Sequence, residues 1–134
     1  FGTHKNNPPM LELLLLLMLK HTIADYFMQY RWMMKDKGTY GALGGVAHSS
    51  WHGILTGLVL VYFNPMGGVP ILWCVLLGVL DSIIHYHIDY VKSNVWRIKK
   101  YGPEDQMFWV THGVDQFLHF ATYILIVGLI DQWI

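Results

Sequence analysis

The sequence predicts an all-α polytopic membrane protein, a bundle of four transmembrane helices with a polar core of histidines and aspartates. Of its 134 residues, 54% are hydrophobic and only 13% are charged, against roughly 25% charged in ordinary soluble domains. Four long apolar stretches each reach the roughly 20 residues that a helix needs to cross a bilayer. Histidines and aspartates recur inside these stretches at helical spacing.

Turn-forming residues begin or separate the four apolar stretches. The predicted helices are 10–34, 40–63, 69–95 and 107–134. The breakers are Pro8-Pro9, Lys37-Gly38, Asn64-Pro65 and Gly102-Pro103. A soluble bundle of this length does not need four such stretches to fill its core. Residues 1–134 are therefore predicted to form a single transmembrane domain.

Basic residues predict the orientation in the membrane. Two predicted loops, between the first and second and between the third and fourth helices, hold most of them: Arg31, Lys35, Lys37, Lys92, Arg97, Lys99 and Lys100. Because basic loops stay in the cytoplasm, both termini are expected outside. The formal net charge is zero, so nothing suggests a nucleic-acid partner.

Each predicted helix carries polar residues at spacings of three or four, which place them on one helix face. They are His21, Asp25 and Gln29; His48 and His52; Asp81, His85 and Asp89; and His112, Asp115, Gln116 and His119. At 1.5 Å rise per residue, the main groups lie roughly 10–21 Å from the cytoplasmic helix ends, at one shared level. Ionisable groups at that depth normally face the bundle interior and mark function.

Imidazole and carboxylate are ligands of first-row metals, so the shared level predicts one or two divalent ions of zinc, iron or manganese. The predicted ligands are His48, His52, His85, Asp89, Asp115 and His119. His21 and Asp25 are predicted to complete a second ion or to act as the catalytic acid–base pair. The residues expected to contact and orient the ligands without binding the ion are Gln29, Gln116, His112, Asp81 and Lys92. A metal-free polar network and a bis-histidine haem are the alternatives, although haem does not explain the repeated aspartates.

Two further residues carry separate predictions. His87 lies about 120° or more from the face that holds His85 and Asp89, so it is not expected to be a ligand. Lys20 on the first predicted helix and Asp81 on the third are both expected near the middle of the bilayer, at nearly the same depth. Because an isolated charge there is costly, they are predicted to form an intramembrane ion pair.

The order of these motifs resembles an uncharacterised family of small bacterial and bacteriophage membrane proteins, domain of unknown function 3307. The matching residues are His21, Asp25 and Gln29, followed by Lys35 or Lys37; His48 and His52; His85, Asp89 and Lys92; and Asp115, Gln116 and His119. The resemblance implies this topology and a bacterial or phage origin, hence a bacterial inner membrane. It implies no activity. A looser similarity links the pattern to membrane-bound metal-dependent hydrolases.

The first functional hypothesis is a metal-dependent hydrolase, embedded in the membrane, that acts on a lipid or lipid-linked substrate. A di-iron oxygen-activating membrane enzyme uses similar ligands and stays open. A non-enzymatic alternative is an accessory subunit of a larger membrane complex, or a phage factor that modifies the host envelope. The expected partners are accordingly membrane lipid and either a larger complex or further copies of the chain.

Overall fold

Every element that the computed structural model describes is helical, which confirms the all-α prediction. The structure describes residues 10–64, 68–131 and 133. The elements are α1 (Met10–Thr22), the π-helical turn η1 (Ile23–Phe27), α2 (Arg31–Lys35), α3 (Leu43–Tyr62), α4 (Ile71–Lys99) and α5 (Gln106–Asp131).

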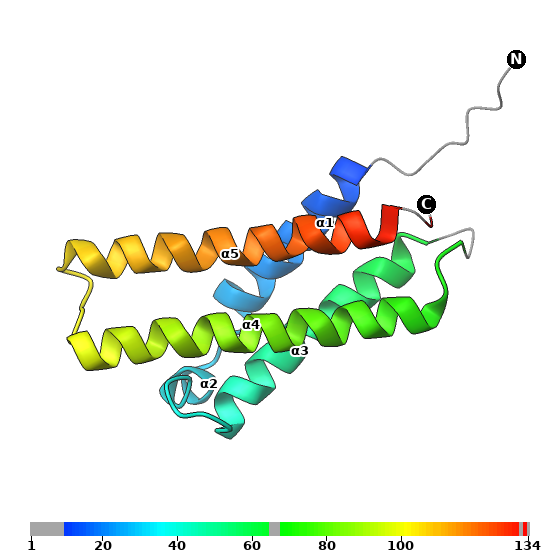
Figure 1. The fold of residues 1–134 in the computed structure, drawn as a ribbon. Helices are drawn as coiled ribbons and strands as arrows, with labels where there is room; N and C mark the ends of the chain where they lie inside the picture. The colour runs from blue at the N-terminus through cyan, green and yellow to red at the C-terminus, as the bar shows by residue number, and fades with distance from the viewer. Residues whose placement is uncertain (1–9, 65–67, 132, 134) are drawn as a thin grey trace, which may run out of the picture.

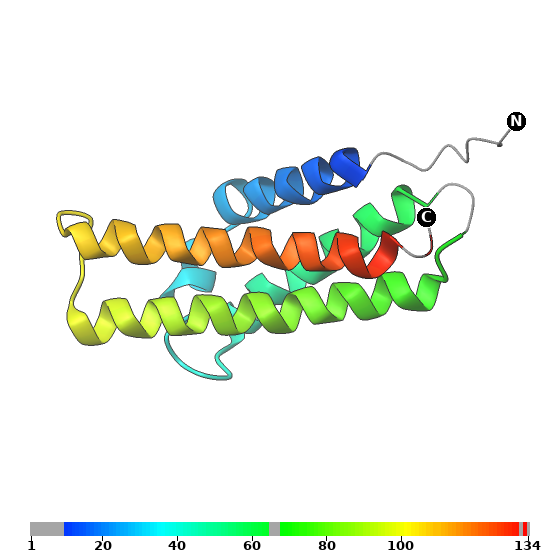
Figure 2. The same cartoon turned by 45° about the horizontal axis from the view of Figure 1, so that its top comes forward.

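Four longer helices pack around one interior (Figures 1 and 2). Helices α4 and α5 run side by side in opposite directions, α3 crosses α4 obliquely, and α1 packs against α3 and α5. The start of α1 and the end of α5 lie at one end of the molecule, and the α4–α5 connection lies at the other (Figure 1). This second end holds the basic residues, and it is called the basic end below.

The predicted continuous helix 10–34 is wrong, because regular α-helix stops at Thr22. The backbone N–H of Met28 bonds to the carbonyl of Ile23, five residues back, at 3.0 Å. Tyr30 is then extended, and α2 is a separate short helix. A π-helical turn changes where the side chains that follow it point. Here it carries Asp25 in the middle of the turn.

The prediction of four membrane-spanning helices is not upheld. Of the described helices, only α4 and α5 are long and apolar enough to cross a membrane. Helix α1 has 13 residues, too few for a full crossing. Helix α3 has 20 residues, but histidine, serine and glycine dilute its apolar content. Only 28% and 33% of the apolar windows of α4 and α5 are buried within the molecule.

Close contact between α3 and α4 aligns the two halves of the polar core. Gly53 and Gly78 face each other so closely that a Cβ on Gly78 would lie 2.6 Å from the Gly53 carbonyl oxygen. Nearby, the Ser82 hydroxyl donates to the Ser49 carbonyl at 2.9 Å. One helix turn further along α4 lies His85. The crossing thus brings the α3 histidines beside it.

An apolar layer fills the bundle on the side of the termini. Its buried members are Leu13, Leu17, Leu60, Val69, Cys74, Leu77, Tyr123, Ile126 and Ile130. The polar cluster lies beyond this layer, towards the basic end.

Candidate metal centre

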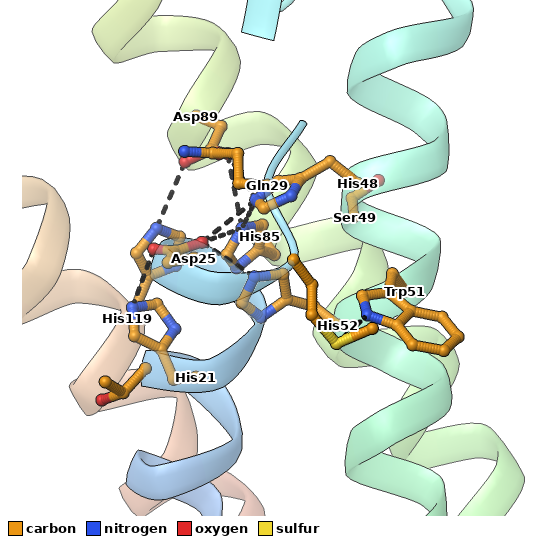
Figure 3. A network of polar contacts seen from close by, with 12 residues as sticks. His21, Asp25, Gln29, His48, Ser49, Trp51, His52, His85, Asp89 and His119 are labelled. Atoms are coloured by element: carbon orange, nitrogen blue, oxygen red, sulfur yellow. Dashed lines mark hydrogen bonds and ion pairs between the residues drawn. The ribbon is translucent and has the colours of Figure 1, made fainter. Parts of the chain in front are cut away.

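Histidines from four elements converge inside the bundle (Figure 3). His21 lies in the last turn of α1, His48 and His52 lie on α3, His85 lies on α4, and His119 lies on α5. Each of these five residues is at most 1% exposed. Burying five imidazole rings costs free energy unless each ring has a polar partner. These five histidines therefore need polar partners inside the bundle.

Asp25 lies at the centre of the cluster (Figure 3). Its Oδ1 atom lies 2.9 Å from His52 Nε2, 3.1 Å from His48 Nε2 and 3.9 Å from His85 Nε2. The Nε2 atoms of His48 and His85 are 3.2 Å apart. The other carboxylate oxygen of Asp25, Oδ2, faces His21 Nε2 at 3.1 Å. The two carboxylate oxygens therefore serve different histidines.

Three of these separations, at 2.9–3.2 Å, are close to those of ligands around one tetrahedral ion. With metal–ligand distances of about 2.0–2.1 Å, tetrahedral ligands lie about 3.3–3.4 Å from one another. The four atoms contributed by Asp25, His48, His52 and His85 all lie within 4.8 Å of one another. This set, called the primary site below, can hold one ion once the stacked rings of His52 and His85 tilt so that their nitrogens point at a common position.

A second ligand group shares a member with the primary site. His85, Asp89 and His119 also bring one ligand atom each within 4.8 Å. Because His85 Nε2 can bind only one ion, the two groups cannot both be complete at once. His119 Nε2 lies 3.4 Å from Asp89 Oδ1 and 3.5 Å from Asp115 Oδ1.

Two lysines pair with the aspartates of α4 and α5. Lys37 Nζ lies 2.7 Å from Asp89 Oδ2, and it also bonds to Gln29. Lys92 Nζ lies 2.8 Å from Asp115 Oδ2. Each ammonium group already neutralises its aspartate, which weakens that aspartate as a metal ligand. Asp25 has histidines as neighbours instead.

The hydrogen bonds of His21 fix its tautomer. Its Nε2 atom faces two acceptors, Asp25 Oδ2 at 3.1 Å and Gln116 Oε1 at 3.0 Å. Its Nδ1 atom lies 2.7 Å from the Tyr123 hydroxyl. The arrangement is satisfied when Nε2 carries the proton and Tyr123 donates to Nδ1. His21 then orients Asp25 rather than competing with it for an ion.

Ring stacking orients the remaining histidines. His85 stacks between His52 and His119, with centroid distances of 3.6 and 4.1 Å and interplanar angles of 22° in both cases. The buried Nδ1 atoms of His48 and His85 have no hydrogen-bond partner among the described residues. Among the described residues, these two rings therefore lack the hydrogen bond from the second ring nitrogen that usually orients a metal-binding histidine.

An ion pair closes the cluster towards the apolar layer, as predicted. Lys20 Nζ lies 2.8 Å from Asp81 Oδ2, and the Thr56 hydroxyl donates to the same oxygen at 2.6 Å. Lys20 also donates to the His52 carbonyl at 3.2 Å. The pair connects α1, α3 and α4 directly behind the primary site.

A cavity of about 550 Å³ leads from the basic end to the cluster. Asp25, Gln29, Asp89, His112 and Gln116 are among its lining residues. His112 makes ring contacts with Trp96 and Trp109 instead of joining either ligand group. The cavity gives a solute or headgroup access to Asp25 from this side.

The comparison with known protein families matches residues 13–133 to a family described as a protein of unknown function, DUF3307. The chain belongs to this family. The match covers nearly the whole chain and all the residues of the cluster. No curated protein and no solved structure matches. Membership in DUF3307 brings no activity with it, so a function has to be argued from the centre itself.

The structure brings most of the predicted site residues of this DUF3307 protein together. Asp25, predicted as half of an acid–base pair, lies instead among the ligand atoms. Asp115, predicted as a ligand, pairs with Lys92. His87 is exposed and bonds to Tyr40, as expected of a residue outside the centre.

Sequence reasoning missed two residues that contact the cluster. Tyr123 bonds to His21, and its position four residues after His119 continues the polar face of α5. That spacing was a usable signal. Lys37, taken for a charge that orients the protein in the membrane, reaches Asp89. Lys37 reaches Asp89 because the chain changes direction after Gln29, and no local sequence pattern predicts that change.

Proposed function

We propose that this protein is a metal-dependent hydrolase, embedded in the membrane, that acts on a lipid or lipid-linked substrate. The observation that carries the proposal is the primary site, where three imidazole nitrogens and one carboxylate oxygen meet at metal-ligand spacing. A divalent ion satisfies all four atoms at once. Zinc is the ion that best suits three histidines and one carboxylate in tetrahedral geometry.

Ion pairs elsewhere in the cluster favour one ion per chain rather than two. Asp89 and Asp115 are already neutralised by Lys37 and Lys92. A second cation beside those ammonium groups is repelled by them. The same ion pairs are what a metal-free, purely structural polar core would contain, and metal analysis separates the two cases.

Outward-facing apolar residues support a position in the membrane. They occur on all four longer helices, and among them are Leu11, Leu58, Leu72 and Phe117, each more than half exposed. Such surface is expected to face lipid. The basic loops then lie in the cytoplasm and the termini outside, in a bacterial inner membrane.

Different residues of the chain have different roles in the proposed hydrolysis. A bound ion lowers the pKa of water and polarises the scissile group. Asp25 and the three histidines would hold the ion, and His21 keeps Asp25 in place. We assign the proton transfer to His119, because it lies between Asp89 and Asp115 and is not a ligand of the primary site. The cavity admits the substrate headgroup.

Elemental analysis of detergent-purified protein tests the proposal. We expect about one first-row metal ion per chain in the wild type and loss of that ion in His52→Ala, because this change removes a ligand of the primary site. His87→Ala is the matched control and keeps the ion. A wild-type protein that is folded, active in no lipid-ester hydrolysis assay and free of metal overturns the proposal.

One observation favours a second candidate, a di-iron oxygen-activating enzyme. Asp25 presents Oδ1 to the α3 histidines and Oδ2 to His21, so each of its oxygens would be available to a different ion. This candidate would require two iron ions per chain, with His21 and His119 as ligands of the second. His21 would then carry its proton on Nδ1 and donate it to the Tyr123 hydroxyl, the reverse of the tautomer described above. The same elemental analysis decides between the two, since the hydrolase requires neither iron nor a second ion.

A further inference from the structure

The cavity at the basic end carries more cationic than anionic side chains. Four cations line it: Lys35, Lys37, Lys92 and Arg97. Two carboxylates line it, those of Asp25 and Asp89. A cleft with an excess of one sign of charge concentrates ligands of the opposite sign.

The four cations differ in what they already bind. Lys37 and Lys92 pair with aspartates of the cluster. Lys35 and Arg97 are exposed, and neither forms an ion pair with a residue that the structure describes. One terminal nitrogen of Arg97 donates to Asn94, which leaves other guanidinium donors free. The rim of the cavity thus offers two uncompensated positive charges.

Neutral groups complete the cavity. The Gln29 side-chain oxygen accepts from Lys37, so its amide N–H groups remain free to donate. The indole N–H groups of Trp96 and Trp109 already bond to Thr111 and to the Pro103 carbonyl. These two rings therefore contribute apolar walls, which suit the part of a lipid next to its headgroup.

We propose that this cavity binds the phosphoryl group of the substrate, with Lys35 and Arg97 as its binding residues. The inference rests on the proposed function and specifies its substrate class, phosphorylated lipids. A guanidinium binds two phosphate oxygens in parallel, and an ammonium group adds a point charge. A phosphate dianion balances the two rim charges. A neutral ester balances neither.

Direct binding measurements test this inference. The ligands are short-chain phosphatidic acid, the matched diacylglycerol without phosphate, and inorganic phosphate. They are titrated by calorimetry into detergent-purified protein of measured metal content. The test variant is Lys35→Gln with Arg97→Gln. The control is Lys99→Gln with Lys100→Gln, which removes two exposed basic charges at the end of α4 that do not line the cavity.

We expect wild type and control to bind phosphatidic acid, and the test variant to bind it about tenfold or more weakly, since charge-assisted hydrogen bonds are lost. Its metal content and helical circular dichroism should match wild type. Tighter binding of phosphatidic acid than of inorganic phosphate identifies a lipid headgroup as the source. The reverse identifies a soluble phosphate ester and still supports the phosphoryl site.

Two results overturn the inference. One is equal affinity for phosphatidic acid and diacylglycerol. The other is a loss of affinity that is the same in the control and test variants, which reduces the effect to general surface charge. Failure of the proposed function looks different, because wild-type protein would then lack metal whatever it binds.

Discussion

Asp25 contacts different histidines with its two carboxylate oxygens. Oδ1 faces the α3 histidines and Oδ2 faces His21. The carboxylate is also the only acidic group of the primary site. Its charge is therefore what offsets a divalent ion there.

Replacing Asp25 should cost more bound metal than replacing Asp115. We expect Asp25→Asn to lower zinc affinity more than about a hundredfold, beyond the range typical of residues that only support a ligand. Asp115→Asn should stay within about 10–100-fold, since Asp115 pairs with Lys92. Competition with a coloured chelator measures both. Equal losses would place Asp115 among the ligands.

The buried pair of Lys20 and Asp81 should behave as a coupled unit. Lys20→Met or Asp81→Asn alone leaves one partner buried without its counter-charge, at a cost of about 3–5 kcal/mol. The double variant should be more stable than the sum of the single changes implies. A double-mutant cycle on thermal unfolding in detergent measures the coupling, and additive effects would contradict it.

At the scale of elements, backbone geometry places the site residues. The π-helical turn carries Asp25, and the α3–α4 crossing at Gly53 and Gly78 sets the distance from His48 and His52 to His85. Both features are local departures from ordinary helix packing. Small changes there should act on the centre from outside it.

Gly78→Ala should destabilise the protein by about 1–3 kcal/mol and lower its metal occupancy, because the added Cβ pushes α3 away from α4. Its Cβ would lie 2.6 Å from a backbone oxygen, which cannot move alone. Gly113→Ala on α5 is the control, since a Cβ there meets nothing within 4 Å. Thermal unfolding and elemental analysis provide the readouts. Equal stability of the two variants would show that the crossing tolerates separation.

At the scale of the whole molecule, the predicted topology can be tested at the connections between the four longer helices. We expect a reporter inserted at Thr39 to lie in the cytoplasm, like one after Lys100, and a reporter at the C-terminus to lie outside. Fusions active on only one side of the membrane measure this. A reporter at Thr39 found outside would leave α4 and α5 as the only crossings.

The sequence by itself determined the helical class, three of the four long helices, the shared level of the histidines and aspartates, and the pairing of Lys20 with Asp81. Periodicity and composition suffice for these, because a residue's position along a helix fixes its face and depth. The helix 10–34 failed, because the π-helical turn and the break at Tyr30 carry no proline or glycine.

Only the tertiary structure decided which polar groups meet. Asp25 and Asp115 look alike in sequence, each at helical spacing from a histidine. In the fold, Asp25 faces histidines from other helices, whereas Asp115 faces Lys92. Helix rotation and crossing decide between such outcomes, and both depend on contacts far apart in the chain, such as Gly53 with Gly78. A pattern within one helix does not contain that information.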